Sequence, residues 1–158
     1  MNDRDEHFMR QALELARRGV EQGHGGPFGA VVVIDDRIVG EGWNRVVQLN
    51  DPTAHAEIIA IRSACEASDA FHLLNATLYT TCEPCPMCMG AIYWARIGRL
   101  IFGATARDAN DIGFSDQWIK DELRKPLENQ RIQIGQRLES ECKHLLQAWW
   151  QREDRVDY

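Results

Sequence analysis

The sequence predicts an α/β fold of three layers, in which a mixed five-stranded sheet is covered by helices on both faces. Two observations carry this prediction. Short β-branched or apolar runs alternate along the chain with segments of helical periodicity, a pattern typical of a sheet with helices on both sides. The length of 158 residues is enough for one domain with its own core. We therefore expect residues 1–158 to form a single domain.

The first half of the chain predicts a helix, a hairpin and a second helix. Apolar residues recur at helical spacing over residues 5–20, and the glycines that follow end this helix. Residues 28–34 are apolar and β-branched, and the Asp35-Asp36 pair turns the chain so that residues 37–41 return as an antiparallel partner. A helix is then predicted over residues 53–67, after a turn at Asn50-Asp51-Pro52.

The second half predicts three more strands and three more helices. Residues 76–81, 100–104 and 131–134 are the expected strands, of which the last has the weakest pattern. Residues 86–95, 118–123 and 139–151 are the expected helices, and residues 105–117 are expected to form a polar functional loop. Strands that are joined through a helix are expected to run parallel.

Charge and cysteine content narrow the possible functions. The net charge of −6 argues against a surface that binds a nucleic-acid backbone, because such surfaces neutralise phosphates with Lys and Arg. No apolar run approaches the roughly 20 residues that cross a bilayer, and no export signal is visible. Five cysteines, three of them within residues 82–88, are typical of metal binding or catalysis in a reducing compartment. These features predict a cytoplasmic protein that binds neither nucleic acid nor membrane.

A zinc site is the strongest chemical prediction. His55-Ala56-Glu57 precedes Pro84-Cys85-Pro86-Met87-Cys88, and zinc is commonly bound by His nitrogen and Cys thiolate. His55, Cys85 and Cys88 supply three ligands, which leaves a fourth position for the water that a catalytic zinc requires. Cys82 is the competing fourth ligand, and we interpret it as a non-ligand. A single C-x-x-C alone is also compatible with structural zinc or redox chemistry, whereas the joint H-x-E and P-C-x-x-C pattern is found in zinc-dependent base deaminases.

The spacing of these residues predicts where the ligands lie on their helices. Cys85 and Cys88 are three apart, so they share one turn, and Pro86 suits the first position of a helix. His55 and Glu57 are about 200° apart around a helix, so both can reach one site only from the helix end. Two helix N-termini are therefore expected to converge on one zinc ion, with Glu57 as the catalytic proton carrier.

The chain resembles the cytidine deaminase superfamily, and within it the small zinc-dependent bacterial guanine deaminases. The resemblance covers nearly the whole chain, including GGPFGAVVV (25–33), NDPTAHAEIIAIR (50–62), CEPCPMCMGAIYWAR (82–96), DANDIGFSD (108–116) and the terminal tyrosine. It implies a cytidine-deaminase-like fold and the hydrolysis of guanine to xanthine and ammonia in purine metabolism. It also implies a homodimer in which the C-terminal segment is exchanged between subunits.

The same resemblance implies which residues bind the base. These are Phe28, Asn44, Ala56, Trp94, Asp116 and, from the partner subunit, a tyrosine equivalent to Tyr158. Ser115 stands where related enzymes often carry a second aspartate, so Ser115 is an alternative contact to Asp116. Phe28 and Trp94 are also compatible with core positions, Asn44 with a turn and Asp116 with a helix cap.

Several functions remain open at this point. Other deaminase substrates are guanosine, another aminated purine, a triazine or a pyrimidine. A tRNA-adenosine deaminase would act on a flipped base, but the last six residues hold three acids and one arginine, a charge that repels phosphate. The third alternative is a structural zinc module or inactive scaffold, which would need four protein ligands and no Glu57.

Overall fold

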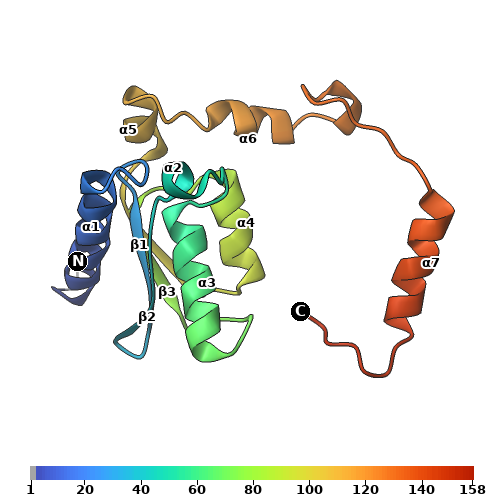
Figure 1. Ribbon diagram of the computed structural model, residues 1–158, viewed down its shortest axis with the longest axis horizontal. Coiled ribbons are helices and arrows are strands. Elements are labelled where there is room, and N and C mark those ends of the chain that lie inside the picture. Colours follow the sequence, from blue (N-terminus) through green and yellow to red (C-terminus); the bar gives the residue numbers. More distant parts are fainter. Residues whose placement is uncertain (1–2) are drawn as a thin grey trace. The chain divides into compact units, whose positions relative to one another are not determined.

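A computed structural model describes residues 3–158 (Figure 1). The chain divides into two compact units, and the boundary in the sequence falls between Asp116 and Gln117. The first unit contains the sheet. Its elements are α1 (Asp3–Glu21), β1 (Gly29–Ile34), β2 (Arg37–Trp43), α2 (Val46–Leu49), α3 (Ala56–Ser68), β3 (Thr77–Cys82), α4 (Pro86–Trp94), β4 (Arg99–Ala104) and α5 (Ala106–Asp111). The second unit contains α6 (Gln117–Leu123), a 3-10 turn η1 (Leu127–Asn129) and α7 (Glu139–Trp150).

The sheet is mixed, as predicted, but has four strands in the order β2-β1-β3-β4. β1 is antiparallel to both β2 and β3, and β3 is parallel to β4. The hairpin β1–β2 and the parallel direction of strands joined through a helix are therefore confirmed. The prediction of a fifth strand was wrong, because residues 131–134 form no strand in the structure. Alternating apolar residues favour a strand only where a neighbouring strand takes up the backbone hydrogen bonds.

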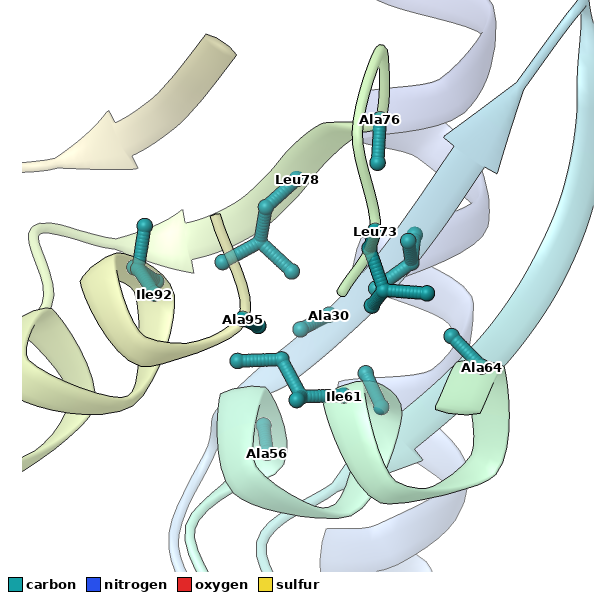
Figure 2. Close-up of a cluster of buried hydrophobic side chains, with 11 residues drawn as sticks. Ala30, Ala56, Ile61, Ala64, Leu73, Ala76, Leu78, Ile92 and Ala95 are labelled. Atoms are coloured by element: carbon teal, nitrogen blue, oxygen red, sulfur yellow. The ribbon is translucent and has the colours of Figure 1, made fainter. Parts of the chain in front are cut away.

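Helices cover the two faces of this sheet, with α1 on one face and α3 and α4 on the other (Figure 1). Alternation along the strands assigns each side chain to a face. Val31, Val33 and Tyr79 pack against Phe8 and Leu15 of α1. On the other face, Ala30 and Leu78 pack against α3 and α4, where small residues allow close approach (Figure 2). Val32 belongs to the same cluster.

Residues 105–117 were expected to form a loop, but they contain the short helix α5. Thr105 caps this helix: its hydroxyl accepts from the Asp108 amide, and the Asp108 carboxylate accepts from the Thr105 amide. This is a capping box with Asp in place of the usual Glu. The T-x-x-D spacing was the available signal for the helix, which the polar composition of the segment concealed.

The second unit has no buried residue in its helices. α7 agrees with the helix expected over residues 139–151, and its apolar side chains Leu145, Leu146 and Trp150 are 72%, 69% and 62% exposed. Among the described residues, no helix combines the length and hydropathy needed to span a membrane.

Asp5 connects α1 to the far edge of the sheet. Its carboxylate accepts hydrogen bonds from the Tyr79 hydroxyl (2.7 Å) and from both terminal nitrogens of Arg99 (2.9 and 2.7 Å). The Arg99 hydrogen bonds, followed by that from Tyr79, lower the pKa of Asp5 from 3.8 to about 2. A carboxylate with a lowered pKa stabilises the fold above about pH 4 and loses this effect as the pH falls towards 2.

Replacing Asp5 by alanine should therefore lower the free energy of unfolding by about 1 kcal/mol at pH 7, a modest value because the Arg99 side chain is half exposed. The difference between wild type and Asp5→Ala should shrink at pH 3, where the unfolded carboxyl is protonated. Urea unfolding at the two pH values measures it. A difference that stays constant with pH would show that the carboxylate charge does not matter.

Candidate functional site

Three metal-binding side chains meet where α3 and α4 begin. His55 is the N-cap residue of α3, Cys85 is the N-cap residue of α4, and Cys88 lies in the first turn of α4. The Cys85 and Cys88 sulfurs are 3.6 Å apart, and His55 Nδ1 lies 3.6 Å from Cys85 Sγ and 3.5 Å from Cys88 Sγ. Within residues 3–158 this is the one cluster of His, Cys or acidic side chains close enough to share a metal ion.

The dimensions of this triangle fit zinc. With Zn–S near 2.3 Å and Zn–N near 2.0–2.1 Å, a tetrahedron requires S···S distances of about 3.8 Å and S···N distances of about 3.6 Å. The observed edges agree with these values to within about 0.2 Å. The donors are therefore arranged as one face of a zinc tetrahedron, and this donor set leaves the fourth corner for a non-protein ligand.

The local sequence explains why both helices begin at the donors. The His55 and Cys85 backbones are extended, with ψ of 155° and 168°, and the helices start at the next residue. For α4 that residue is Pro86, which lacks an amide hydrogen and is well suited to the first helical position. The prediction that two helix N-termini converge on one site is confirmed.

The electrostatics of the donors favour metal binding. Hydrogen bonds from Cys88 and then His55 lower the pKa of Cys85 to about 4, so this sulfur is a thiolate at neutral pH. The hydrogen bond to Cys85, together with burial, raises the pKa of Cys88, and the hydrogen bond to Cys85 raises the pKa of His55. Metal binding requires deprotonated thiols, so a thiol with a lowered pKa favours it.

Glu57 lies in the first turn of α3 and is 6% exposed. Burial raises the pKa of its carboxyl group, and the carboxyl interacts electrostatically with Cys85, His55 and Cys88. Burial thus favours the protonated form of this acid beside the metal-binding cluster. Such an environment suits a group that both takes up and returns a proton. The Glu57 carboxyl therefore lies beside the donors. This agrees with the expectation that His55 and Glu57 reach one site from the end of their helix.

Cys82 is separate from the donor cluster. It ends β3 and is buried, and its thiol donates to the Thr105 carbonyl oxygen at 3.6 Å. The donor group that the structure brings together does not include it. This placement agrees with its interpretation as a non-ligand.

Two of the expected base-binding residues, Ala56 and Asn44, are buried in the first unit. Ala56 is fully buried between His55 and Glu57 in sequence. Asn44 is 6% exposed, and its Oδ1 accepts from the amides of Gly26 (3.2 Å) and Val46 (3.3 Å), which leaves its amide nitrogen as the group that can donate to a ligand.

An aromatic wall adjoins these residues. The ring of Phe28 meets that of Phe114 edge to face, with centroids 5.0 Å apart. Phe114 was not among the predicted site residues, although it lies in the DANDIGFSD segment. No periodicity or spacing in the sequence connects Phe114 to Phe28, because their contact joins distant parts of the chain.

Trp94, Asp116 and Tyr158 are the other expected base-binding residues. Trp94 ends α4 and is 69% exposed, whereas Cys88 lies six residues earlier on this helix, about 9 Å along its axis. Asp116 is the last residue of the first unit, and Tyr158 ends the second.

Gly25 has no room for a side chain. A Cβ atom there would lie 2.0 Å from Asn44 Oδ1 and 2.9 Å from the Asn44 carbonyl oxygen. The sequence resemblance implies that Asn44 binds the base. On that expectation, Gly25→Ala should displace Asn44 and raise the KM for the base about tenfold, with bound zinc unchanged. Steady-state kinetics with metal analysis checks this. As a control, Gly98→Ala adds a methyl group that meets only the Ala76 carbonyl oxygen, at 4.0 Å, and an equal rise in KM there would contradict the assignment.

Comparisons with known proteins agree with this geometry. The family model for the cytidine and deoxycytidylate deaminase zinc-binding region matches residues 2–104. The chain is 47% identical to guanine deaminase of Bacillus subtilis over 97% of its length and 98% of that protein. It is also 53% identical to tRNA-specific adenosine deaminase of Haemophilus influenzae, over 69% of this chain and 63% of the other.

A solved structure gives the same result. The crystal structure of guanine deaminase from Bacillus subtilis superposes with a TM-score of 0.94 at 47% identity, and the match covers 100% of this chain and 99% of that one. The donors, the buried acid beside them and the family match lead to one conclusion: the chain belongs to the cytidine and deoxycytidylate deaminase family of zinc-binding proteins.

Proposed function

We propose that this chain hydrolyses guanine to xanthine and ammonia, with one zinc ion held by His55, Cys85 and Cys88. The observation that carries the proposal is the tetrahedral spacing of these donors beside the buried Glu57. Guanine is favoured as the substrate because the similarity to a guanine deaminase extends over nearly the full length of both chains. We place the reaction in purine metabolism in the cytoplasm, a compartment that suits five unpaired cysteines.

Glu57 performs the proton transfers of this reaction. Zinc, when bound, lowers the pKa of its water ligand to about 7 and so supplies a nucleophile at neutral pH. Glu57 accepts the proton of the attacking water and passes it to a ring nitrogen beside C2 of the base. Glu57 then takes the second proton of the former water from the C2 hydroxyl and passes it to the amine. As the C–O bond becomes a carbonyl, the C2–N bond breaks and the protonated amine leaves as ammonia.

The remaining residues hold the base in place. Phe28 and Phe114 offer an apolar wall to a planar purine, as ligand pockets usually do. The amide nitrogen of Asn44 is suited to donate to an acceptor such as N7 or O6 of guanine. Ala56, between His55 and Glu57 in the sequence, forms the floor of the proposed base site. The Asp116 carboxylate is suited to accept a hydrogen bond from the amino side of the base, and Ser115 is the alternative contact.

The direct test is ammonia release from guanine, guanosine, adenine and cytosine by the zinc-loaded protein. We expect guanine to be the preferred substrate by kcat/KM. Preference for guanosine would show that the pocket admits ribose. No release from guanine under conditions where another base reacts would overturn the proposal.

A second candidate is tRNA-adenosine deaminase, favoured by the 53% identity over the zinc-binding part of the chain. The C-terminal tail opposes it. Arg152 and Arg155 are paired with Asp154 and Asp157, so these cations are already neutralised within the protein. A gel shift with tRNA at moderate salt separates the two candidates, and we expect no complex.

We also propose a homodimer in which each C-terminal segment completes the partner's site. α7 exposes Leu145, Leu146 and Trp150, an apolar surface of the kind that soluble proteins bury in interfaces. Tyr158 of one subunit would then cap the base held by the other, and the exposed Trp94 would lie in or near the interface. Size-exclusion chromatography with light scattering should give twice the mass of the 18.1 kDa chain.

Mixing variants tests the exchange. Glu57→Ala removes the proton carrier and Tyr158→Ala removes the cap, so each homodimer should be impaired. If the tail serves the partner, co-refolded mixed dimers contain one intact site and regain activity. If the tail serves its own subunit, every site in the mixture lacks one residue and no activity returns.

A further inference from the structure

Glu83 connects the metal-binding loop to the segment of residues 105–116, called here the α5 segment. This segment begins at the end of β4, contains α5 and ends with Phe114, Ser115 and Asp116. Glu83 lies between β3 and the N-cap residue Cys85 of α4, two residues from a metal donor. The catalytic chemistry of the proposed function leaves the Glu83 side chain without a role.

The α5 segment depends on polar contacts for its position. α5 has six residues and none is buried, and a helix of this length is marginal on its own. Three hydrogen bonds tie its start to the metal-binding loop: Ala106 N donates to Glu83 Oε2 (3.0 Å), Glu83 N donates to the Ala104 carbonyl (2.8 Å), and Cys82 Sγ donates to the Thr105 carbonyl (3.6 Å).

The Glu83 bond is the strongest side-chain contribution among these. A carboxylate that accepts from a backbone amide at a helix start makes a charge-assisted hydrogen bond and also interacts favourably with the helix dipole. Thiol–carbonyl bonds such as that of Cys82 are weak. Removing the Glu83 carboxylate therefore leaves the Ala106 amide without this acceptor, while the backbone bond of Glu83 to Ala104 remains.

The far end of the α5 segment reaches Phe28, which is proposed to hold the base. The Phe114 amide donates to the Ala109 carbonyl (3.0 Å), so the position of Phe114 follows that of α5. The Phe114 ring meets Phe28 edge to face, and both rings border Gly26. The Gly26 amide in turn donates to Asn44 Oδ1.

We propose that Glu83 is a positioning residue for substrate binding: by holding the start of α5 against the metal-binding loop, it sets the distance between the Phe114–Phe28 wall and the zinc donors. The proposal deepens the assignment of this site to a purine base and rests on it. Glu83 touches neither the base nor the donors, so its loss weakens base binding more than it slows the chemical step.

The test compares Glu83→Ala, Glu83→Gln and the control Glu66→Ala, which removes an exposed carboxylate from α3. For Glu83→Ala we expect the KM for guanine to rise about tenfold, kcat to change less than about twofold, and zinc content to stay at the wild-type level. Glu83→Gln keeps an acceptor oxygen and should restore most of the loss. Glu66→Ala should match wild type.

A second readout does not depend on turnover. Amide hydrogen exchange at Ala106, followed by NMR, should be at least about tenfold faster in Glu83→Ala than in wild type, and near wild type in Glu83→Gln. An unchanged KM despite faster exchange would overturn the proposal, as would a loss of zinc or of kcat in place of the rise in KM. If wild type does not act on guanine at all, the proposed function fails, and the exchange rates still decide whether Glu83 holds α5.

Discussion

Replacing Glu57 by alanine should slow guanine turnover by about a thousandfold while the protein still binds one zinc ion. The carboxyl is 6% exposed and lies beside the donors without being one of them. General acid–base groups contribute about a hundred- to ten-thousandfold to enzymatic rates. Because both proton transfers of the reaction pass through this one side chain, we expect the loss to appear in kcat more than in KM.

The matched variant Glu57→Gln tests whether proton transfer, and not the size of the side chain, is what the reaction needs. It retains the shape of the side chain and removes its ability to exchange a proton, so it should be as inactive as Glu57→Ala. Metal analysis and a ligand-binding measurement with guanine show whether the site survives. Undiminished turnover in both variants would favour a structural zinc module or another proton carrier, and zinc loss in both would place Glu57 in the metal shell.

The zinc centre could be predicted from the sequence because each of its two halves is made by residues that are close together in the chain. Cys85 and Cys88 share one helical turn, and Pro86 marks the start of that helix. His55 and Glu57 can serve one site only from a helix end, and that condition alone requires α3 to point at the metal. The structure contains this arrangement, with donor distances suited to a tetrahedron.

Features that depend on distant partners could not be predicted in this way. Residues 131–134 alternate like a strand, but a strand needs a neighbour to satisfy its backbone, and within this chain they form none. The Phe28–Phe114 contact and the Glu83–Ala106 hydrogen bond join residues 86 and 23 positions apart, and no periodicity connects them. Trp94 ends α4, and its expected place in the pocket stays a prediction.

Replacing the cysteines of residues 82–88 one at a time should affect zinc binding and activity very differently. Cys85→Ser should lose zinc and with it all measurable deaminase activity, because an alcohol is a poor zinc ligand at neutral pH and two remaining donors hold the ion weakly. Treating wild type with a chelator should produce the same inactive state, and added zinc should restore it. Cys82→Ala should keep one zinc ion per chain, since its thiol bonds to the Thr105 carbonyl and lies outside the donor cluster.

Zinc content measured by elemental analysis on folded protein, with circular dichroism as the check on folding, decides between a three-donor and a four-donor site. Three protein donors leave a coordination position for water, which is a requirement of hydrolysis, whereas four would close the site and leave a structural metal. Zinc lost equally from Cys82→Ala and Cys85→Ser would therefore argue against hydrolytic chemistry at this centre. Retention in Cys82→Ala alone, together with the inactivity of Glu57→Gln, is the combination that only a catalytic zinc explains.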